Sequence, residues 1–234
     1  MTARGREALR SSPSPRRHCA RRVIVPGTTR PSDLLASFFA AAICTLLLAA
    51  GAAIAYALTG LDWLHWTAMH LALLGGVSQL IVGAGQFFSC AFLATDPPSR
   101  RMIGAQLLAW NAGTALVAVG EPTAITPLVD AGGLLLAIGV VLFAISLRDM
   151  QRRSLQRARW ALRWYQACAV CLGLGGLLGL LLARDTPWPH GSLLGAHLAL
   201  TLGGWLGTAI IGTLHTFFPS LTATPLRHPR LQGP

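Results

Sequence analysis

Six long apolar runs, separated by short polar turns, dominate the pattern of the chain. They cover residues 34–58, 65–94, 102–119, 125–147, 164–183 and 190–218. A run of about 20 apolar residues is long enough to cross the hydrocarbon core of a bilayer as a helix. Lipid also requires the backbone hydrogen bonds to close within each segment. The pattern therefore predicts an all-α integral membrane protein, built as a bundle of six transmembrane helices.

The two ends of the chain are polar and predict separate tails. Residues 1–31 carry eight arginines and Ser-Pro repeats without hydrophobic periodicity. We expect a flexible, arginine-rich cytoplasmic tail over 1–31, the six-helix membrane domain over 32–219, and a short cytoplasmic tail over 220–234. The arginine pairs at 16–17 and 21–22 also suggest a twin-arginine export signal. The first apolar run is too long for a cleaved signal peptide, so a retained first span is favoured.

Composition supports the membrane class. Hydrophobic residues make up 53% of the chain, charged residues 12%, and the mean hydropathy is +0.54. A water-soluble domain carries about 25% charged residues, and disorder requires low hydrophobicity. Both classes are therefore excluded for most of the chain. The five cysteines are an odd number, and four lie in or near apolar runs, so no disulfide framework is expected.

The distribution of arginine predicts the orientation. The net charge of +11 comes from 19 arginines and 8 acidic residues, and the chain has no lysine. All arginines except Arg184 lie in the two tails and in the connections after the second and fourth runs. Because arginine accumulates on the cytoplasmic side, both termini are predicted to be cytoplasmic, in the plasma membrane. The pI of 11.3 would indicate nucleic acid in a soluble protein. Here topology explains the charge, and the lipid bilayer is the expected partner.

Histidines inside the apolar runs are the main candidates for chemistry, because an ionisable group in a membrane helix is costly and indicates function. At about 1.5 Å per residue, His70 and His197 lie at similar depth in the second and sixth runs, which have the same direction. Two imidazoles at one level on two helices suit a haem held from both faces. We therefore predict that His70 and His197 bind haem b or copper. The alternative is that both only hydrogen-bond water or a carbonyl group.

Other polar residues in the runs are weaker candidates. His65 and His190 lie at the hydrated outer edge, where histidine costs little, although imidazole also suits a copper site. His215 and Gln86 could share a second, inner level as a hydrogen-bonded pair or a proton relay, although for Gln86 a simple hydrogen bond between helices is favoured. The Cys-x-x-Cys motif at 168–171 places both thiols on one side of a helix. In lipid, cysteine is mainly a small packing residue.

Three segments resemble a known family. They are LHWTAMHLALLGGV at 64–77, WNAG at 110–113, and GAHLALTLGGWLGT at 195–208, which continues to a Phe-Pro pair at 218–219. They are similar to the membrane domain of an actinobacterial family, in which this domain precedes cupredoxin domains of the copper nitrite reductase or multicopper oxidase type. A more distant likeness is to subunit-I-type membrane proteins of the haem-copper oxidase superfamily. The resemblance covers roughly residues 60–225.

The resemblance implies a redox module that works with a copper protein at the outer face. This chain differs from the family at two points. The family has a histidine followed by phenylalanine near the inner end of the second span, whereas this chain has Gln86-Phe87. An inner metal or haem site is therefore not expected. No cupredoxin domain follows the sixth run, so copper chemistry of that kind is expected only from a partner.

Three functions remain open at this point. The first is a membrane redox module that binds haem b or copper between the second and sixth helices and passes electrons to a cupredoxin-type or other redox protein. His70 and His197 are its proposed ligands, with His215, His65 and His190 as further metal candidates. The second is a non-catalytic membrane anchor or assembly subunit without a cofactor. The third is a small-molecule or metal transporter, disfavoured because the two halves show no clear repeat. No catalytic residue is proposed, and at most the chain is a subunit of an oxidoreductase.

Overall fold

Helices make up nearly all of the described structure. The computed structural model describes residues 30–155, 160–184 and 186–222, which are 87% helical and contain no strand. In chain order the elements are α1 (Pro31–Thr59), α2 (Asp62–His70), the π-helix η1 (Leu71–Val77), α3 (Ser78–Leu93), α4 (Arg100–Gly120), α5 (Thr126–Arg153), α6 (Trp160–Leu182), α7 (His190–Leu198), the π-helix η2 (Ala199–Gly207) and α8 (Thr208–Leu221). The predicted tails, 1–31 and 220–234, lie almost wholly outside the described residues.

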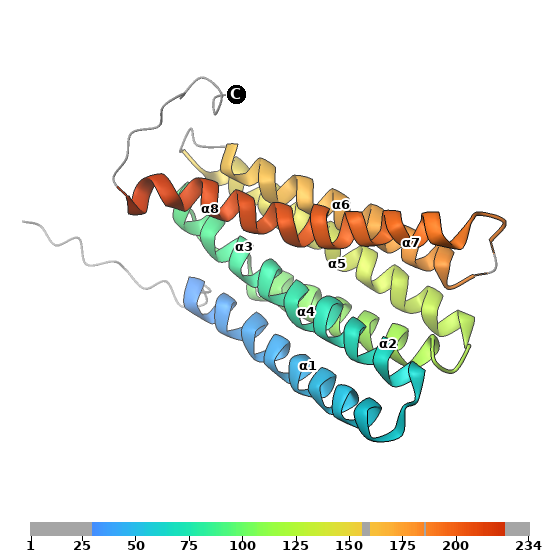
Figure 1. Ribbon diagram of the computed structural model, residues 1–234. Coiled ribbons are helices and arrows are strands. Elements are labelled where there is room, and N and C mark those ends of the chain that lie inside the picture. Colours follow the sequence, from blue (N-terminus) through green and yellow to red (C-terminus); the bar gives the residue numbers. More distant parts are fainter. Residues whose placement is uncertain (1–29, 156–159, 185, 223–234) are drawn as a thin grey trace, which may run out of the picture.

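Among the described residues, six helical segments are long and apolar enough to cross a membrane, and Figure 1 shows how their helices are arranged. We number these candidate spans in chain order: Pro31–Thr59, Asp62–Leu93, Arg100–Gly120, Thr126–Arg153, Leu162–Leu182 and His190–Phe218. The second span joins α2, η1 and α3 into one continuous rod, and the sixth joins α7, η2 and α8. For the described residues, the prediction of an all-helical fold with six long apolar helices is confirmed.

Local sequence signals explain where several helices begin and end. Pro31 occupies the first turn of α1, where its missing N–H costs nothing. The Oγ of Ser99 accepts a hydrogen bond from the Met102 amide at 3.3 Å and caps the start of α4, as serine commonly does. Gly60 ends α1 with φ of +69°, a left-handed conformation that glycine adopts without strain.

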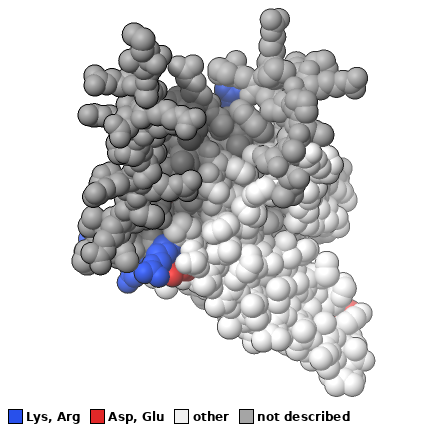
Figure 2. All heavy atoms as spheres, turned by 90° about the vertical axis from the view of Figure 1, so that its left-hand side faces the viewer, with Lys and Arg blue, Asp and Glu red and all other residues white. Residues whose placement is uncertain are grey.

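The bundle has two chemically different ends. At the arginine-rich end, α1, α4 and α6 begin and α3, α5 and α8 end. The described arginines there are Arg30, Arg100, Arg101, Arg148, Arg152, Arg153 and Arg163. Figure 2 looks onto this end and shows blue arginine side chains on the described surface. At the opposite, arginine-poor end, Arg184 is the one described arginine, and it forms an ion pair with Asp130.

The core lies where α3, α4, α5, α6 and η2 meet. Trp110, Phe143 and Trp205 are almost fully buried there. The rings of Phe143 and Trp205 meet edge to face, with centroids 6.1 Å apart. Helices α4 and α5 touch through glycine, because a Cβ on Gly132 would lie 2.8 Å from the carbonyl oxygen of Gly113. Small residues that let helix backbones approach are typical of membrane bundles.

Two π segments interrupt the second and sixth spans at corresponding positions. Segment η1 begins directly after His70, and η2 begins two residues after His197. Each holds a Gly-Gly pair, at 75–76 and at 203–204. The i→i+5 bonding is seen at the C-terminal end of each segment. The amide of Ser78 donates to the carbonyl oxygen of Leu73, and the amide of Thr208 donates to that of Gly203. Short π segments within α-helices occur frequently at functional sites.

Side chains satisfy the carbonyl groups of η1. The indole Nε1 of Trp110 donates to the carbonyl oxygen of Leu74 at 2.9 Å, and the amide Nε2 of Gln79 donates to that of Gly75 at 2.7 Å. The Oγ of Ser78 donates to the carbonyl oxygen of Leu73 at 2.9 Å. A buried polar group without a partner is costly in lipid, so these donors stabilise the π conformation.

Candidate functional site

His70 is the last residue of α2 and is half-buried. Its ring stacks on the ring of Trp66, with centroids 3.8 Å apart, and its Nδ1 lies 2.9 Å from the carbonyl oxygen of Trp66. A carbonyl oxygen only accepts hydrogen bonds, so Nδ1 is the donor and carries the proton. In the neutral ring, Nε2 then keeps its lone pair, which is the form of histidine that binds metals.

His197 has the same tautomer, held by a different element. Its Nδ1 lies 2.8 Å from the carbonyl oxygen of Gly175 on α6. The ring also lies against Gly179, where an added Cβ would be 3.1 Å from Cε1 of His197. The imidazole ring of His197 thus packs on two glycines of α6. As in His70, Nε2 is the ring nitrogen that can accept a hydrogen bond or bind a metal.

The second and sixth spans are in contact from their middle to the arginine-rich end, where the rings of Phe88 and Phe217 meet, and they diverge toward the end that carries the two histidines (Figure 1). Where they meet, Nε1 of Trp205 in η2 donates to Oγ of Ser78 at 2.9 Å. The hydroxyl of Ser78 in turn donates to Leu73 in η1, so a hydrogen-bonded chain connects the two π segments. Among the described residues, neither Nε2 has a hydrogen-bond partner.

The other predicted histidines lie elsewhere. His65 and His190 are exposed, and the His65 ring lies 5.2 Å from the ring of Tyr56. His215 is exposed, and its ring lies 5.8 Å from that of Trp164 on α6. Within the described ranges, no three histidine, cysteine, aspartate or glutamate side chains come together to hold a metal ion. The structure places the His70 ring on Trp66 of its own helix and the His197 ring against Gly175 and Gly179 of α6, and the other candidates add no further ligand among the described residues.

The inner polar level differs from the expectation. Gln86 is fully buried and donates from Nε2 to Oε1 of Gln106 on α4 at 2.9 Å, not to His215. Gln106 donates onward to Oγ of Ser146 on α5 at 2.7 Å. The optional Gln86–His215 pair does not form, because the two side chains face different helices, and Gln86 instead makes the hydrogen bond between helices that the sequence favoured for it. Sequence reasoning missed Gln106 and Ser146, whose only signal was polarity inside an apolar run.

A second amide pair lies one level closer to His70. Nδ2 of Asn111 donates to Oε1 of Gln79 at 3.1 Å, and Nε2 of Gln79 lies 3.3 Å from Oδ1 of Asn111. Each amide also bonds a backbone carbonyl group within its own helix. Such satisfied pairs hold membrane helices together, and they leave no free group for chemistry.

The Cys-x-x-Cys motif follows the packing interpretation. The thiol of Cys168 is buried and donates to the carbonyl oxygen of Tyr165 at 3.1 Å. Cys171 packs against Gly204, where an added Cβ would lie 2.6 Å from Cβ of Cys171. Both thiols are free. The motif fills space between α6 and η2.

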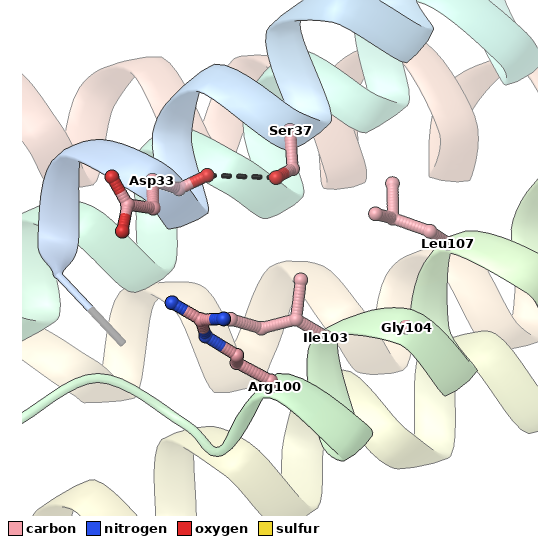
Figure 3. A pocket seen from close by; sticks show the side chains of 6 residues that line it. All are labelled: Asp33, Ser37, Arg100, Ile103, Gly104 and Leu107. Atoms are coloured by element: carbon pink, nitrogen blue, oxygen red, sulfur yellow. Dashed lines mark hydrogen bonds between the residues drawn. The ribbon is translucent and has the colours of Figure 1, made fainter. Parts of the chain in front are cut away.

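Cavities lie at the arginine-rich end. One of about 420 Å³ lies between α1 and α4, with Asp33 and Arg100 facing each other across it (Figure 3). Another, of about 640 Å³, lies between the connection before α4 and the end of α5. Neither is lined by His70 or His197.

Comparison of this chain with family models, with curated proteins and with solved structures gave no match. The similarity to the actinobacterial membrane domain therefore stays a prediction, and the function must be argued from the site itself.

Proposed function

We propose that this chain is a multi-pass plasma-membrane protein that binds haem b between its second and sixth spans, through His70 and His197, and passes electrons to a redox partner at the outer face. One observation carries the proposal: both rings donate Nδ1–H to a backbone carbonyl oxygen, from Trp66 in one case and Gly175 in the other. Histidines that ligate metals commonly donate their second ring nitrogen in this way, which fixes tautomer and orientation.

The donor set favours haem over a copper ion. His70 and His197 would hold the haem iron, since neutral imidazole is a ligand that haem proteins use. Within the described residues, no further histidine, cysteine or carboxylate joins them to complete a copper site of three protein ligands. When bound, a b-type haem supplies one-electron transfer. The protein would orient the two imidazoles, through Trp66 and the glycines of α6, and would exclude water by its apolar spans.

The charge distribution supports an orientation with both termini in the cytoplasm. The described arginines, apart from Arg184, gather at one end of the bundle. Arginine is retained on the cytoplasmic side of membranes, so His70 and His197 would lie in the outer half of the bilayer. A partner at the outer face would then be close to the proposed haem.

A second candidate is a membrane anchor or assembly subunit without a cofactor. The observation in its favour is that the buried amides of the second and third spans satisfy each other, as in Gln79–Asn111 and Gln86–Gln106. Such pairs act only to join helices. This candidate does not explain why His70 and His197 have the same tautomer, with Nε2 unprotonated, so we place it second.

A visible spectrum of the detergent-purified protein tests the choice. We expect a reduced-minus-oxidised difference spectrum of the b type, with about one haem per chain. A colourless protein free of iron and copper would contradict the haem proposal and favour the anchor. If elemental analysis found copper and no haem, the result would contradict the haem proposal and would favour copper, the other cofactor predicted from the sequence.

A further inference from the structure

The cavity of about 640 Å³ at the arginine-rich end has a charged wall and an apolar wall. It lies between the connection that precedes α4 and the last turns of α5, far along the chain from the two histidines. Pro97, Met102 and Ile145 provide apolar surface, whereas Arg148 and Arg152 provide charge. A mixed lining of this kind suits an amphipathic ligand.

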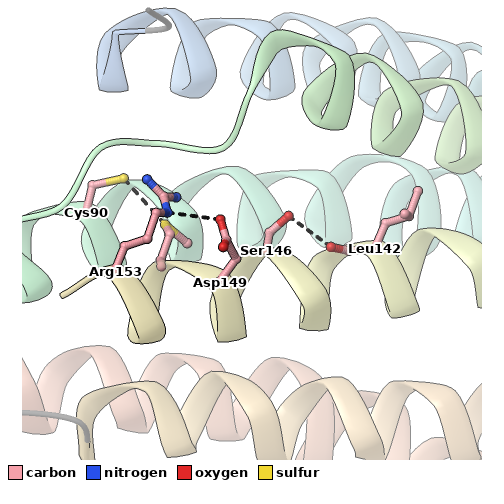
Figure 4. Close-up of polar contacts among 6 residues, drawn as sticks. Cys90, Leu142, Ser146, Asp149 and Arg153 are labelled. Carbon is pink, nitrogen blue, oxygen red and sulfur yellow. Dashed lines mark hydrogen bonds and ion pairs between the residues drawn. The ribbon is translucent and has the colours of Figure 1, made fainter.

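The cavity has more free positive than free negative charge. Arg153 is paired with Asp149, with Nε of the arginine 3.0 Å from Oδ2 of the carboxylate (Figure 4). Arg148 and Arg152 have no ion-pair partner among the described residues, and Asp96 is the remaining acid of the lining. Two unpaired guanidinium groups therefore face one unpaired carboxylate.

The residue that caps α4 also belongs to the lining of this cavity. Ser99 lines the cavity and caps the helix by accepting from the Met102 amide. The anion recognition in this wall comes from Arg148 and Arg152, because arginine pairs readily with phosphate oxygens.

An apolar stripe leads from the cavity along α5. Ile145 lines the cavity and is 46% exposed, and Val141 and Ile138, one and two turns further, are 55% and 41% exposed. Residues at this spacing lie on one side of a helix. The stripe runs from the arginine-rich end toward the middle of the bundle, as an acyl chain does below a headgroup.

We infer that this cavity binds the phosphate headgroup of an anionic phospholipid, with Arg148 and Arg152 as its cationic contacts and one acyl chain along Ile145, Val141 and Ile138. Basic pockets between membrane helices bind anionic headgroups in this way. The inference needs the helices to lie in a bilayer but does not depend on the haem.

Lipid binding to the detergent-purified full chain tests the inference. Phosphatidylglycerol is the probe, with phosphatidylcholine as the neutral-headgroup control and glycerol phosphate as the headgroup without chains. Native mass spectrometry gives the affinity of each. The test variant is Arg148→Gln with Arg152→Gln. The matched control is Arg30→Gln with Arg163→Gln, which removes two charges from the same end but outside this cavity.

We expect phosphatidylglycerol to bind more tightly than phosphatidylcholine, and the test variant to weaken that binding at least about tenfold, from the ~1 kcal/mol that each arginine near a membrane surface contributes. The control variant should keep the preference. Ile145→Gln should weaken the lipid but leave glycerol phosphate unchanged. Equal losses in both double variants would overturn the site in favour of diffuse surface charge. Glycerol phosphate binding as tightly as the lipid would overturn the lipid in favour of a soluble phosphate.

Discussion

At the residue scale, the two histidines reach the same state by different routes. His70 is held by a carbonyl group of its own helix, one turn earlier, and His197 by a carbonyl group of α6, 22 residues earlier in the chain. Both therefore present Nε2 with a lone pair. If they serve one centre, the loss of either should have the same consequence.

We predict that His70→Ala and His197→Ala each abolish or shift a b-type spectrum to the same extent. The double variant should add little, because mutations that act on one centre are not additive. Spectra and haem content of the purified variants measure this. His65→Ala and His190→Ala are the controls and should keep the spectrum, since both side chains are exposed. Additive, independent effects of the His70 and His197 variants would contradict a shared site.

The sequence proposed these two residues as candidates but could not orient their side chains. Their matched depth follows from counting residues along two apolar runs. The acceptor of His197 is a backbone carbonyl of Gly175, and a backbone group has no identity that a sequence pattern can reveal. The same holds for Gln86: its polarity marked it as significant, but its partner depends on how α3 is rotated against α4, which the helical period alone does not determine.

At the element scale, the contact between α4 and α5 depends on glycine. We predict that Gly132→Ala destabilises the protein by about 1–3 kcal/mol, the range for overpacking a close contact, because its Cβ would meet the carbonyl of Gly113. Gly173→Ala is the control, since nothing lies within 4 Å of its added Cβ. It should be neutral or stabilising. Denaturation in mixed micelles measures both, and equal effects would contradict the contact.

The pair Gln86–Gln106 joins the second and third spans. A double-mutant cycle with Gln86→Leu and Gln106→Leu should give a coupling energy of about 0.6 kcal/mol and no more than about 1.7 kcal/mol, the range for hydrogen bonds between membrane helices. Gln106→Leu alone should cost more than Gln86→Leu, because Gln106 also donates to Ser146. A coupling of zero in the same denaturation assay would show that the bond contributes nothing.

Element types were predictable from hydrophobic runs, but the π segments were not. Residues 71–77 and 199–207 consist of leucine, alanine, glycine and similar residues that fit an α-helix equally well. What distinguishes them is donors from elsewhere, such as Trp110 on α4, which bonds Leu74. Depths counted at a uniform rise per residue therefore hold up to each histidine but drift beyond it.

At the scale of the whole molecule, arginine divides the bundle into two unlike ends. We predict that a reporter fused after Pro234 is active only in the cytoplasm, because all but one of the arginines lie on that side of the predicted topology. Fusions within the connection at 121–125 are the control and should report the outer face. Outer-face activity after Pro234 would reverse the orientation and would place the proposed haem in the inner half of the bilayer.

The π segments also determine where the chain can change its length. A π turn contains a residue more than the α-helical turn it replaces, so losing one residue there restores α-helical bonding with the flanking faces still aligned. We predict that deletion of Ala72, within η1, reduces yield and thermal stability less than deletion of Ile138, in the middle of α5. Deletion of Ala72 removes the extra residue of a π turn. Deletion of Ile138 rotates the part of α5 that follows it by about 100° relative to the part before it. Deletion of a single residue should thus be tolerated within η1 and η2, the π segments that follow His70 and His197.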